Sequence, residues 1–304
     1  MRIFFLFIMR RMSYTVTIPV SRTHTNREVI QMIIGMRGHD FGRMEPEALA
    51  AKIAAHGYRA TQLAFGKAFP RPAQEYMTRD ALLSIRSAFA AQDVRVPVMG
   101  CYVSASDRDK AVRQSAKEKF ADALRASVIL GAGCVGTETT HFTFEESERE
   151  AAYARLLDFM RHVVPVAEAC GAIVGVEPVA YHTLATPEMT AQLLRDVPSR
   201  HVRVILDMAN LVPPGVSDAA VQKELLERAL HCFGGRICVL HVKDGVWNGE
   251  NKWENRPLGE GIMDFKTLLP LLRAHDDSLC ALREGVWPGM ADEEYAVMRR
   301  WAQL

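Results

Sequence analysis

Four side chains that often bind divalent metal ions stand at the ends of four successive apolar runs. The runs read "AIVGVE", "RVILD", "ICVLH" and "LCALRE", and their last residues are Glu177, Asp207, His241 and Glu284. Successive members are 30, 34 and 43 residues apart, and one strand–helix–strand unit takes roughly 30 residues or more. The C-terminal ends of consecutive strands meet at one face of a (β/α)₈ barrel. This spacing therefore predicts one shared site at that face.

The chemistry of these four side chains indicates the kind of metal. Three carboxylates and one imidazole form a mostly hard oxygen site, which suits Mn²⁺, Mg²⁺, Co²⁺ or Zn²⁺. Taken singly, each carboxylate is explained as well by a salt bridge at the rim, and His241 by a hydrogen-bonded core position. A buried charge at the end of an apolar strand costs several kcal/mol unless it is paired or bound to a metal. Four such positions in succession favour one divalent cation over four unrelated residues.

The elements that must position these residues alternate regularly from Met32 to the end of the chain. Apolar runs predict eight strands, at residues 32–37, 60–65, 95–102, 133–138, 172–177, 202–207, 236–242 and 279–284. Helical periodicity and capping residues predict helices at 45–56, 78–91, 107–130 and 146–170, and another that starts at Pro187 with Thr186 as its cap. Strict alternation indicates a parallel sheet covered by helices. We predict an α/β fold with a single (β/α)₈ TIM barrel over residues 32–304.

Length and composition agree with one barrel domain. The chain has 304 residues, 49% of them hydrophobic, and a net charge of +1 with basic and acidic residues interspersed. A nucleic-acid-binding surface normally needs a basic patch, so no nucleic-acid partner is expected. The six cysteines form no Cys-x-x-Cys pair, which favours buried free thiols and a cytoplasmic location.

The N-terminal segment is interpreted separately from the barrel. Residues 1–31 are expected to be an extension or the product of a mis-set translation start, poorly ordered in places. The apolar run "RIFFLFIM" within it is far shorter than the ~20 residues that span a membrane. No membrane partner is expected.

Several short motifs resemble a known family. "VEP" at Glu177, "LDMANL" at Asp207, "HVKDG" at His241, "RPLGEGIMDF" at 256–265 and "LREG" at Glu284 are similar to those of the sugar phosphate isomerase/epimerase family of xylose isomerase-like TIM barrels. That family includes ketose 3-epimerases and keto-glycoside epimerases. The resemblance implies that the four strand-end residues coordinate one cation, most often Mn²⁺. It also implies that the two glutamates exchange a proton on opposite sides of a sugar carbon.

Physical chemistry supports those implied roles. Removing a proton beside a carbonyl leaves an enediolate, whose negative charge a divalent cation stabilises as a Lewis acid. Two carboxylates on opposite faces of one carbon can remove the proton and return it with inversion. We therefore predict a metal-dependent isomerase or epimerase of a sugar, keto-sugar or keto-glycoside.

Other functions remain open at this point. A lyase or dehydratase acting on a related keto-sugar or an inosose would begin with the same proton removal. A non-catalytic sugar-binding subunit is an alternative of another class, although it need not keep a costly charged cluster. A DNA-repair endonuclease with a related barrel is not expected, because it would need several more histidines and a basic face, and the sequence shows neither.

A further group of residues is expected to contact the substrate. By the resemblance, Arg256 is set against substrate oxygens; its alternative is a surface salt bridge with Glu254 or Glu260. Position 210 is often histidine in ketose epimerases and is asparagine here, which indicates that the substrate is positioned differently. Trp247 and Trp253 offer faces on which sugar rings stack, or could contact the barrel or a second copy of the chain. Self-association is expected for this reason. The other candidates at the predicted mouth are Glu138, His141, His182, Lys67 and His39.

Overall fold

The computed structural model describes residues 32–142, 145–250 and 252–303. The prediction about residues 1–31 therefore lies outside the described part of the chain. Within that part, no helix is both long and apolar enough to cross a membrane.

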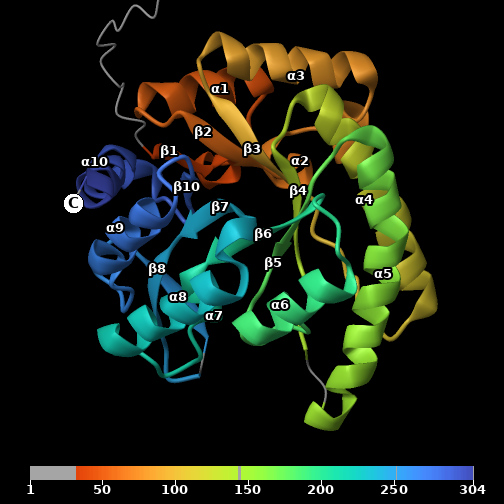
Figure 1. Ribbon diagram of the computed structural model, residues 1–304. Coiled ribbons are helices and arrows are strands. Elements are labelled where there is room, and N and C mark those ends of the chain that lie inside the picture. Colours follow the sequence, from red (N-terminus) through yellow and green to blue (C-terminus); the bar gives the residue numbers. More distant parts are fainter. Residues whose placement is uncertain (1–31, 143–144, 251, 304) are drawn as a thin grey trace, which may run out of the picture. The chain divides into compact units, whose positions relative to one another are not determined.

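Parallel strands close into a barrel, as the sequence predicts (Figure 1). The strands are β1 (Ile33–Arg37), β2 (Ala60–Leu63), β3 (Arg95–Gly100), β4 (Cys134–Glu138), β5 (Val174–Glu177), β6 (Val202–Asp207), β7 (Ile237–Val242) and β10 (Cys280–Arg283). Their order around the barrel is β1-β10-β7-β6-β5-β4-β3-β2. The register pairs Glu138 with Glu177 and Asp207 with His241. All four of these residues therefore lie at the same end of the barrel.

Helices surround the strands and connect each one to the next along the chain (Figure 1). They are α1 (Pro46–Ala55), α2 (Phe65–Ala68), α3 (Arg79–Ala91), α4 (Lys110–Leu130), α5 (Arg149–Cys170), α6 (Pro187–Asp196), α7 (Met208–Leu211), α8 (Ala219–Phe233), α9 (Phe265–His275) and α10 (Ala291–Gln303). Thr186 caps α6 through a 3.2 Å bond from Met189 N, as expected. Gly131 and Gly171 end α4 and α5 with φ of +77° and +78°, where a side chain would be strained.

Some predicted boundaries were wrong by a few residues. The helix expected over 107–130 begins at Lys110, because Asp109 is the residue whose carboxylate accepts the free N–H groups of the first turn. The strand expected over 60–65 ends at Leu63, since Phe65 already begins α2. The helix expected from Glu146 starts as a 3₁₀ turn and becomes α-helical at Arg149.

The segment after β7 contains a β-hairpin that is not among the predicted strands. Strands β8 (Asp244–Trp247) and β9 (Trp253–Arg256) pair antiparallel, with Trp247 opposite Trp253. The buried carboxylate of Asp244 accepts backbone N–H bonds from Gly245, Gly259, Gly261 and Met263 at 2.9–3.2 Å. This one side chain therefore ties the base of the hairpin to the chain that follows it.

All six cysteines are free thiols, as predicted. Cys134 and Cys280 are buried, whereas the other four are only partly buried. The expectation that the thiols are buried is thus correct for two positions and incomplete for the rest.

A buried ion pair joins the last barrel strand to the last helix. Arg283, at the end of β10, is fully buried and donates to Glu294 Oε1 of α10 at 2.6 Å. It also donates to the backbone oxygens of Arg256, at 3.1 Å, and of Glu284. The pair therefore fixes the backbone on which the candidate ligand Glu284 stands.

Substitution of Glu294 tests that role. Glu294→Gln leaves the Arg283 cation buried without its counter-charge, a change that typically costs about 3–5 kcal/mol. For a domain of this size we expect the Tm to fall by roughly 10 °C. The exposed neighbour Glu293 is the matched control, and Glu293→Gln should leave the Tm unchanged in differential scanning calorimetry. Equal Tm values for both variants would contradict a structural role of the pair.

Candidate metal centre at the barrel mouth

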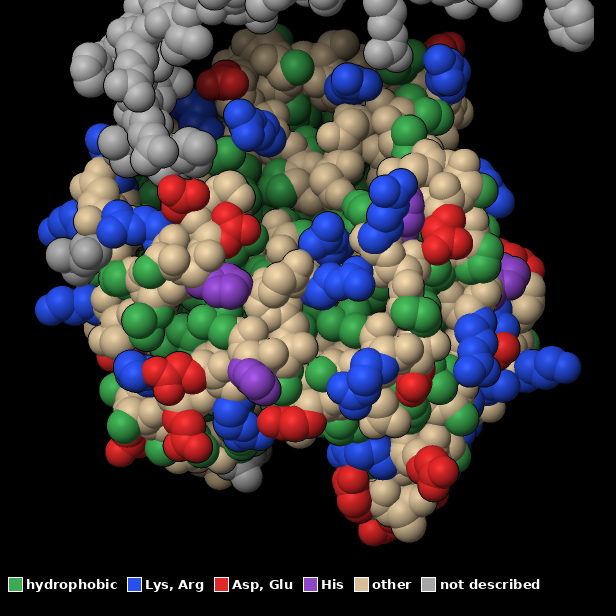
Figure 2. All heavy atoms as spheres, in the orientation of Figure 1, with side chains coloured by type: hydrophobic (Ala, Val, Ile, Leu, Met, Phe, Trp, Pro, Cys, Tyr) green, Lys and Arg blue, Asp and Glu red, His purple; other side chains and the backbone are tan. Residues whose placement is uncertain are grey.

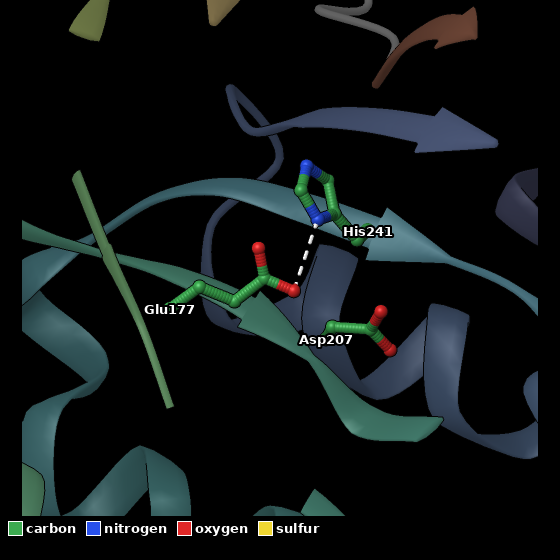
Figure 3. Close-up of side chains that lie close together, drawn as sticks. All are labelled: Glu177, Asp207 and His241. Atoms are coloured by element: carbon green, nitrogen blue, oxygen red, sulfur yellow. Dashed lines mark ion pairs between the residues drawn. The ribbon is translucent and has the colours of Figure 1, made fainter. Parts of the chain in front are cut away.

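Glu177, Asp207 and His241 converge at the ends of β5, β6 and β7 (Figure 3). One potential ligand atom from each lies within 4.8 Å of the others. The carboxylate of Glu177 points toward the imidazole, with Oε1 3.4 Å from His241 Nδ1. The three residues are 0–2% exposed. Side chains that were 30 and 34 residues apart in sequence thus form one buried cluster.

The unpartnered atoms of this cluster fit a cation. Within the described residues, neither ring nitrogen of His241 has a hydrogen-bond partner, and neither does Asp207 Oδ2. The other oxygen of Asp207 is occupied, because it accepts from the N–H groups of Ala209 and Asn210 at the start of α7. Buried polar atoms without partners are costly, and a divalent ion held by these residues would satisfy Asp207 Oδ2 and one of the two ring nitrogens.

Glu284, the fourth predicted ligand, lies beside the three-residue cluster rather than within it. Its Oε1 is 3.5 Å from His241 Nδ1, and its Oε2 is 3.6 Å from a guanidinium nitrogen of Arg37. Its backbone N–H donates to Val242 O at 3.0 Å, which extends the β10–β7 ladder by one residue beyond β10. Glu177 and Glu284 therefore approach His241 from two different strands.

Burial and mutual charge set the protonation of this cluster. Burial lowers the pKa of His241, but Glu284 and Glu177 outweigh it and raise the value to about 9. Burial raises the pKa of Glu284, yet His241, Arg37 and Lys243 lower it overall to about 2. Burial raises the pKa of Asp207 to about 6 against the opposing charge of Lys243. At neutral pH these shifts favour a protonated His241 imidazole beside an ionised Glu284.

The raised pKa of His241 predicts how metal affinity depends on pH. A histidine must be neutral to bind a metal, so below pH 9 a cation has to displace its proton. The apparent Kd for Mn²⁺ should therefore rise about tenfold for each pH unit below that value. Isothermal titration calorimetry in buffers of different ionisation enthalpy should count about one proton released at pH 7. A Kd that does not change between pH 7 and 9 would contradict this prediction.

Asn210 and Lys243 contact the carboxylates of the cluster. Asn210 donates its amide N–H to Glu177 Oε1 at 2.6 Å, and its amide oxygen accepts from Lys243 Nζ. The same Nζ lies 3.2 Å from Asp207 Oδ2. Lys243 and its neighbour Asp244 make different contacts: Lys243 lies beside Asp207, whereas Asp244 anchors the hairpin.

The candidates from the fourth and fifth loops form a second group at the mouth. His182 Nε2 lies 3.6 Å from Glu138 Oε2, and the His182 ring is 5.7 Å from that of His141. Burial and nearby Glu177 raise the pKa of Glu138 to about 7. Burial lowers the pKa of His182 to about 4, so this imidazole is neutral at physiological pH.

The remaining sequence candidates lie at other edges of the mouth. Burial, together with Arg37 and Lys67, lowers the pKa of His39 to about 4. Lys67 Nζ lies over the ring of Tyr102, 4.9 Å from its centroid. Arg256 is ion-paired with Glu254 at 2.9 Å, which is the alternative that the sequence analysis named for it.

An aromatic wall stands above the fifth and seventh strands. We use this name for Tyr181, Trp247 and Trp253. The Trp247 ring meets Trp253 edge to face at 5.3 Å and Tyr181 at 6.4 Å. The indole N–H of Trp247 is buried and has no partner among the described residues. The wall thus combines apolar ring faces with one unused donor.

Arg37 and Tyr181 belong to the site but were not predicted from the sequence. Arg37 ends β1 and binds both Asp40, at 2.8 Å, and Glu284. Asp40 in turn accepts N–H bonds from Gly285 and Val286, so this pair braces the loop after Glu284. The sequence does carry a signal for Arg37, because this residue ends an apolar run just as the proposed metal ligands do. Tyr181 carried no comparable signal, since it lies in an irregular loop.

The surface agrees with the small net charge. Figure 2 shows basic and acidic side chains interspersed over the face turned to the viewer.

Known proteins share this architecture. Residues 50–301 match the model of the family described as xylose isomerase-like TIM barrel. The structure is similar to that of 3-keto-D-glucoside 4-epimerase from E. coli, with a TM-score of 0.70, 16% identity, and coverage of 89% of this chain and 99% of the other. It is also similar to D-psicose 3-epimerase crystallised in the presence of D-fructose, with a TM-score of 0.69, 16% identity and coverage of 89% and 99%.

A third similar structure is that of the IolI protein with a zinc atom, with a TM-score of 0.67, 15% identity and coverage of 90% and 95%. At such identities the likeness is one of fold. No curated protein sequence matches the chain significantly.

Proposed function

Because the chain belongs to the xylose isomerase-like TIM barrel family, we propose that it is a divalent-metal-dependent isomerase or epimerase of a keto-sugar. The observation that carries the proposal is the convergence of Glu177, Asp207 and His241 at the barrel mouth, with the Glu284 carboxylate 3.5 Å from the same imidazole. The similar epimerase structures support the same class of reaction.

The proposed metal ligands are Glu177, Asp207, His241 and Glu284, and the proposed cation is Mn²⁺. Hard carboxylate oxygens with one imidazole suit that ion, although Co²⁺, Mg²⁺ and Zn²⁺ accept the same set. When bound, the cation supplies Lewis-acid stabilisation of the negative charge that develops on substrate oxygens.

The two glutamates carry the proton transfer in this proposal. Oε1 of Glu177 accepts from Asn210, which leaves Oε2 to take a proton from the substrate carbon beside the carbonyl. Glu284 follows another strand, β10, and its carboxylate lies 3.5 Å from His241 Nδ1, beside the cluster that contains Glu177. This position lets Glu284 act as the base for one face of the carbon while Glu177 serves the other. Return of the proton on the opposite face inverts the carbon.

The aromatic wall supports a substrate with a second ring, such as a keto-glycoside. Sugar rings pack well against indole and phenol faces, and Tyr181 and Trp247 lie next to the Glu138–His182 pair. The unused indole N–H of Trp247 is a donor for a sugar hydroxyl. Arg256 could add donors to substrate oxygens if it left Glu254.

Deuterium exchange tests the proposal directly. The protein would be loaded with Mn²⁺ and incubated in D₂O with ketoses, 3-keto-glucosides and inososes, and the products analysed by NMR and mass spectrometry. We expect solvent deuterium at the carbon beside the carbonyl of one substrate class, together with inversion or carbonyl migration. The exchange should disappear when the metal is removed by a chelator and return when Mn²⁺ is added.

The same experiment separates the alternatives. Exchange followed by loss of water or of the aglycone would identify a lyase that uses the same first step. No exchange with any substrate at full metal loading, but measurable sugar binding, would identify a non-catalytic sugar-binding protein.

A further inference from the structure

Lys243 occupies an unusual place for a lysine. Its side chain is 15% exposed and its ammonium lies against the cluster, 3.2 Å from Asp207 Oδ2. It also donates to Asn210 Oδ1. Burial lowers the pKa of Lys243, but Asp207, Glu284 and Glu177 outweigh it and raise the pKa overall. The lysine is therefore a fixed positive charge beneath the site.

The contact with Asn210 determines which way the amide group points. An ammonium can only donate and an ionised carboxylate can only accept. With Lys243 on one side of Asn210 and Glu177 on the other, only one amide orientation satisfies both neighbours. The oxygen must face the lysine, and the NH₂ group must face Glu177 Oε1, where the bond is 2.6 Å. A flipped amide would set its NH₂ group against the ammonium and its oxygen against the carboxylate.

The fixed orientation of Asn210 also orients the carboxylate of Glu177. Because Asn210 is held in one orientation, it always donates to the same oxygen, Oε1, and the carboxylate plane is fixed by that bond. Asn210 is itself 5% exposed, and its backbone N–H donates to Asp207 Oδ1 at 3.2 Å. The amide is therefore anchored at both its backbone and its side chain.

The contact between Lys243 and Asp207 opposes metal binding. The ammonium approaches Oδ2, the one oxygen of Asp207 that the start of α7 does not use. It approaches off the direction of a hydrogen bond, since Oδ2 has no such partner. A positive charge at this distance repels a cation that binds the same oxygen. The Lys243 ammonium therefore lowers the affinity of this site for a metal ion.

We propose that Lys243 is a positioning residue: through Asn210 it holds the Glu177 carboxylate in the orientation needed for proton transfer, and it does so at some cost in metal affinity. The inference rests on the proposed function for its effect on turnover, but not for its effect on metal binding. Lys243 and Asn210 together orient the catalytic carboxylate of Glu177.

The test compares Lys243→Met with Lys266→Met. Lys266 is an exposed lysine on α9, so the control removes the same group without touching the site. For Lys243→Met at pH 8 we expect kcat to fall by roughly tenfold or more, the scale of a coupling between groups in one hydrogen-bond network. We expect KM for the sugar to change little. The Kd for Mn²⁺, measured by calorimetry on the metal-free protein, should stay the same or decrease.

A double-mutant cycle with Asn210→Leu shows whether the two residues act along one path. If Lys243 works through Asn210, the double variant should lose no more kcat than the more impaired single variant. Additive losses, or a weaker Mn²⁺ affinity that parallels the loss of kcat, would overturn the proposal. Should Lys243→Met not fold, Lys243→Gln replaces it in the cycle, because it places a polar group in the same buried position.

The failure of this inference is distinguishable from failure of the proposed function. If the wild-type protein exchanged no substrate hydrogen, the proposed function would fail. The Mn²⁺ affinities of Lys243→Met and wild type would still decide whether the ammonium opposes metal binding, and a weaker affinity in the variant would overturn that part.

Discussion

Glu284→Gln should bind the metal and yet fail to exchange the carbon-bound hydrogen of the substrate. A neutral amide cannot accept a proton at neutral pH, and loss of a general base typically lowers the rate on the order of 10²–10⁴-fold. Glu284 stands beside the cluster of Glu177, Asp207 and His241 rather than within it, so those three ligands remain. The deuterium-exchange rate at saturating Mn²⁺ measures the effect, and metal analysis of the dialysed protein shows whether the ion is retained.

Glu177→Gln should abolish exchange as well, but for two reasons. The substitution removes the second base, and it also removes a ligand atom of the three-residue cluster. We therefore expect a larger loss of Mn²⁺ affinity in this variant than in Glu284→Gln, because Glu284 lies beside the cluster rather than within it. Glu260, an exposed residue of the loop after the hairpin, gives the matched control. If either Glu177→Gln or Glu284→Gln were as active as Glu260→Gln, the two-carboxylate mechanism would be wrong.

Addition of Mn²⁺ should raise the thermal stability of the protein. A ligand that binds only the folded state stabilises it by about 2.7 kcal/mol at a concentration of 100 times its Kd. For a domain of this size the Tm should rise by roughly 5–10 °C. The physical reason is that the cation would replace the proton on one ring nitrogen of His241 and would also give Asp207 Oδ2 a partner, and neither atom has a hydrogen-bond partner among the described residues. Differential scanning fluorimetry with and without a chelator measures the shift.

Removal of one ligand should abolish that stabilisation. His241→Ala has no imidazole to bind the ion, and we expect its Tm to be the same with Mn²⁺ as with the chelator. His231, a histidine of the last turn of α8, provides the control, and His231→Ala should keep the full shift. A shift that survives in His241→Ala would show that Mn²⁺ binds elsewhere on the chain.

The barrel could be predicted from the sequence because its signals repeat. Each strand is a short apolar run, and capping residues such as Thr186 and stop glycines such as Gly171 mark the ends of the helices. The position of a charged residue after each run also predicted which end of the barrel carries the site. Glu177, Asp207 and His241 meet there because parallel strands bring their C-terminal ends to one face.

The contacts between distant side chains could not be predicted in the same way. Arg283 is buried because Glu294 reaches it from a helix that begins eight residues later, and no local pattern encodes that pairing. Lys243 had a weak signal: it follows His241 by two residues, which in a strand places both on the same side. The hairpin also had only a weak signal, because its strands are four residues long and five residues separate Trp247 from Trp253.

The anchoring of the hairpin by Asp244 has a consequence for how such a protein can diversify. The four N–H bonds to this carboxylate hold the hairpin at its base, while Trp247 and Trp253 pair at its other end. Changes of length or composition in the turn therefore leave the proposed metal ligands in place. Under the proposed function, the hairpin would contribute to substrate preference while the barrel strands carry the chemistry, so we expect an exchange of hairpins between related barrels to change specificity and to leave metal binding intact.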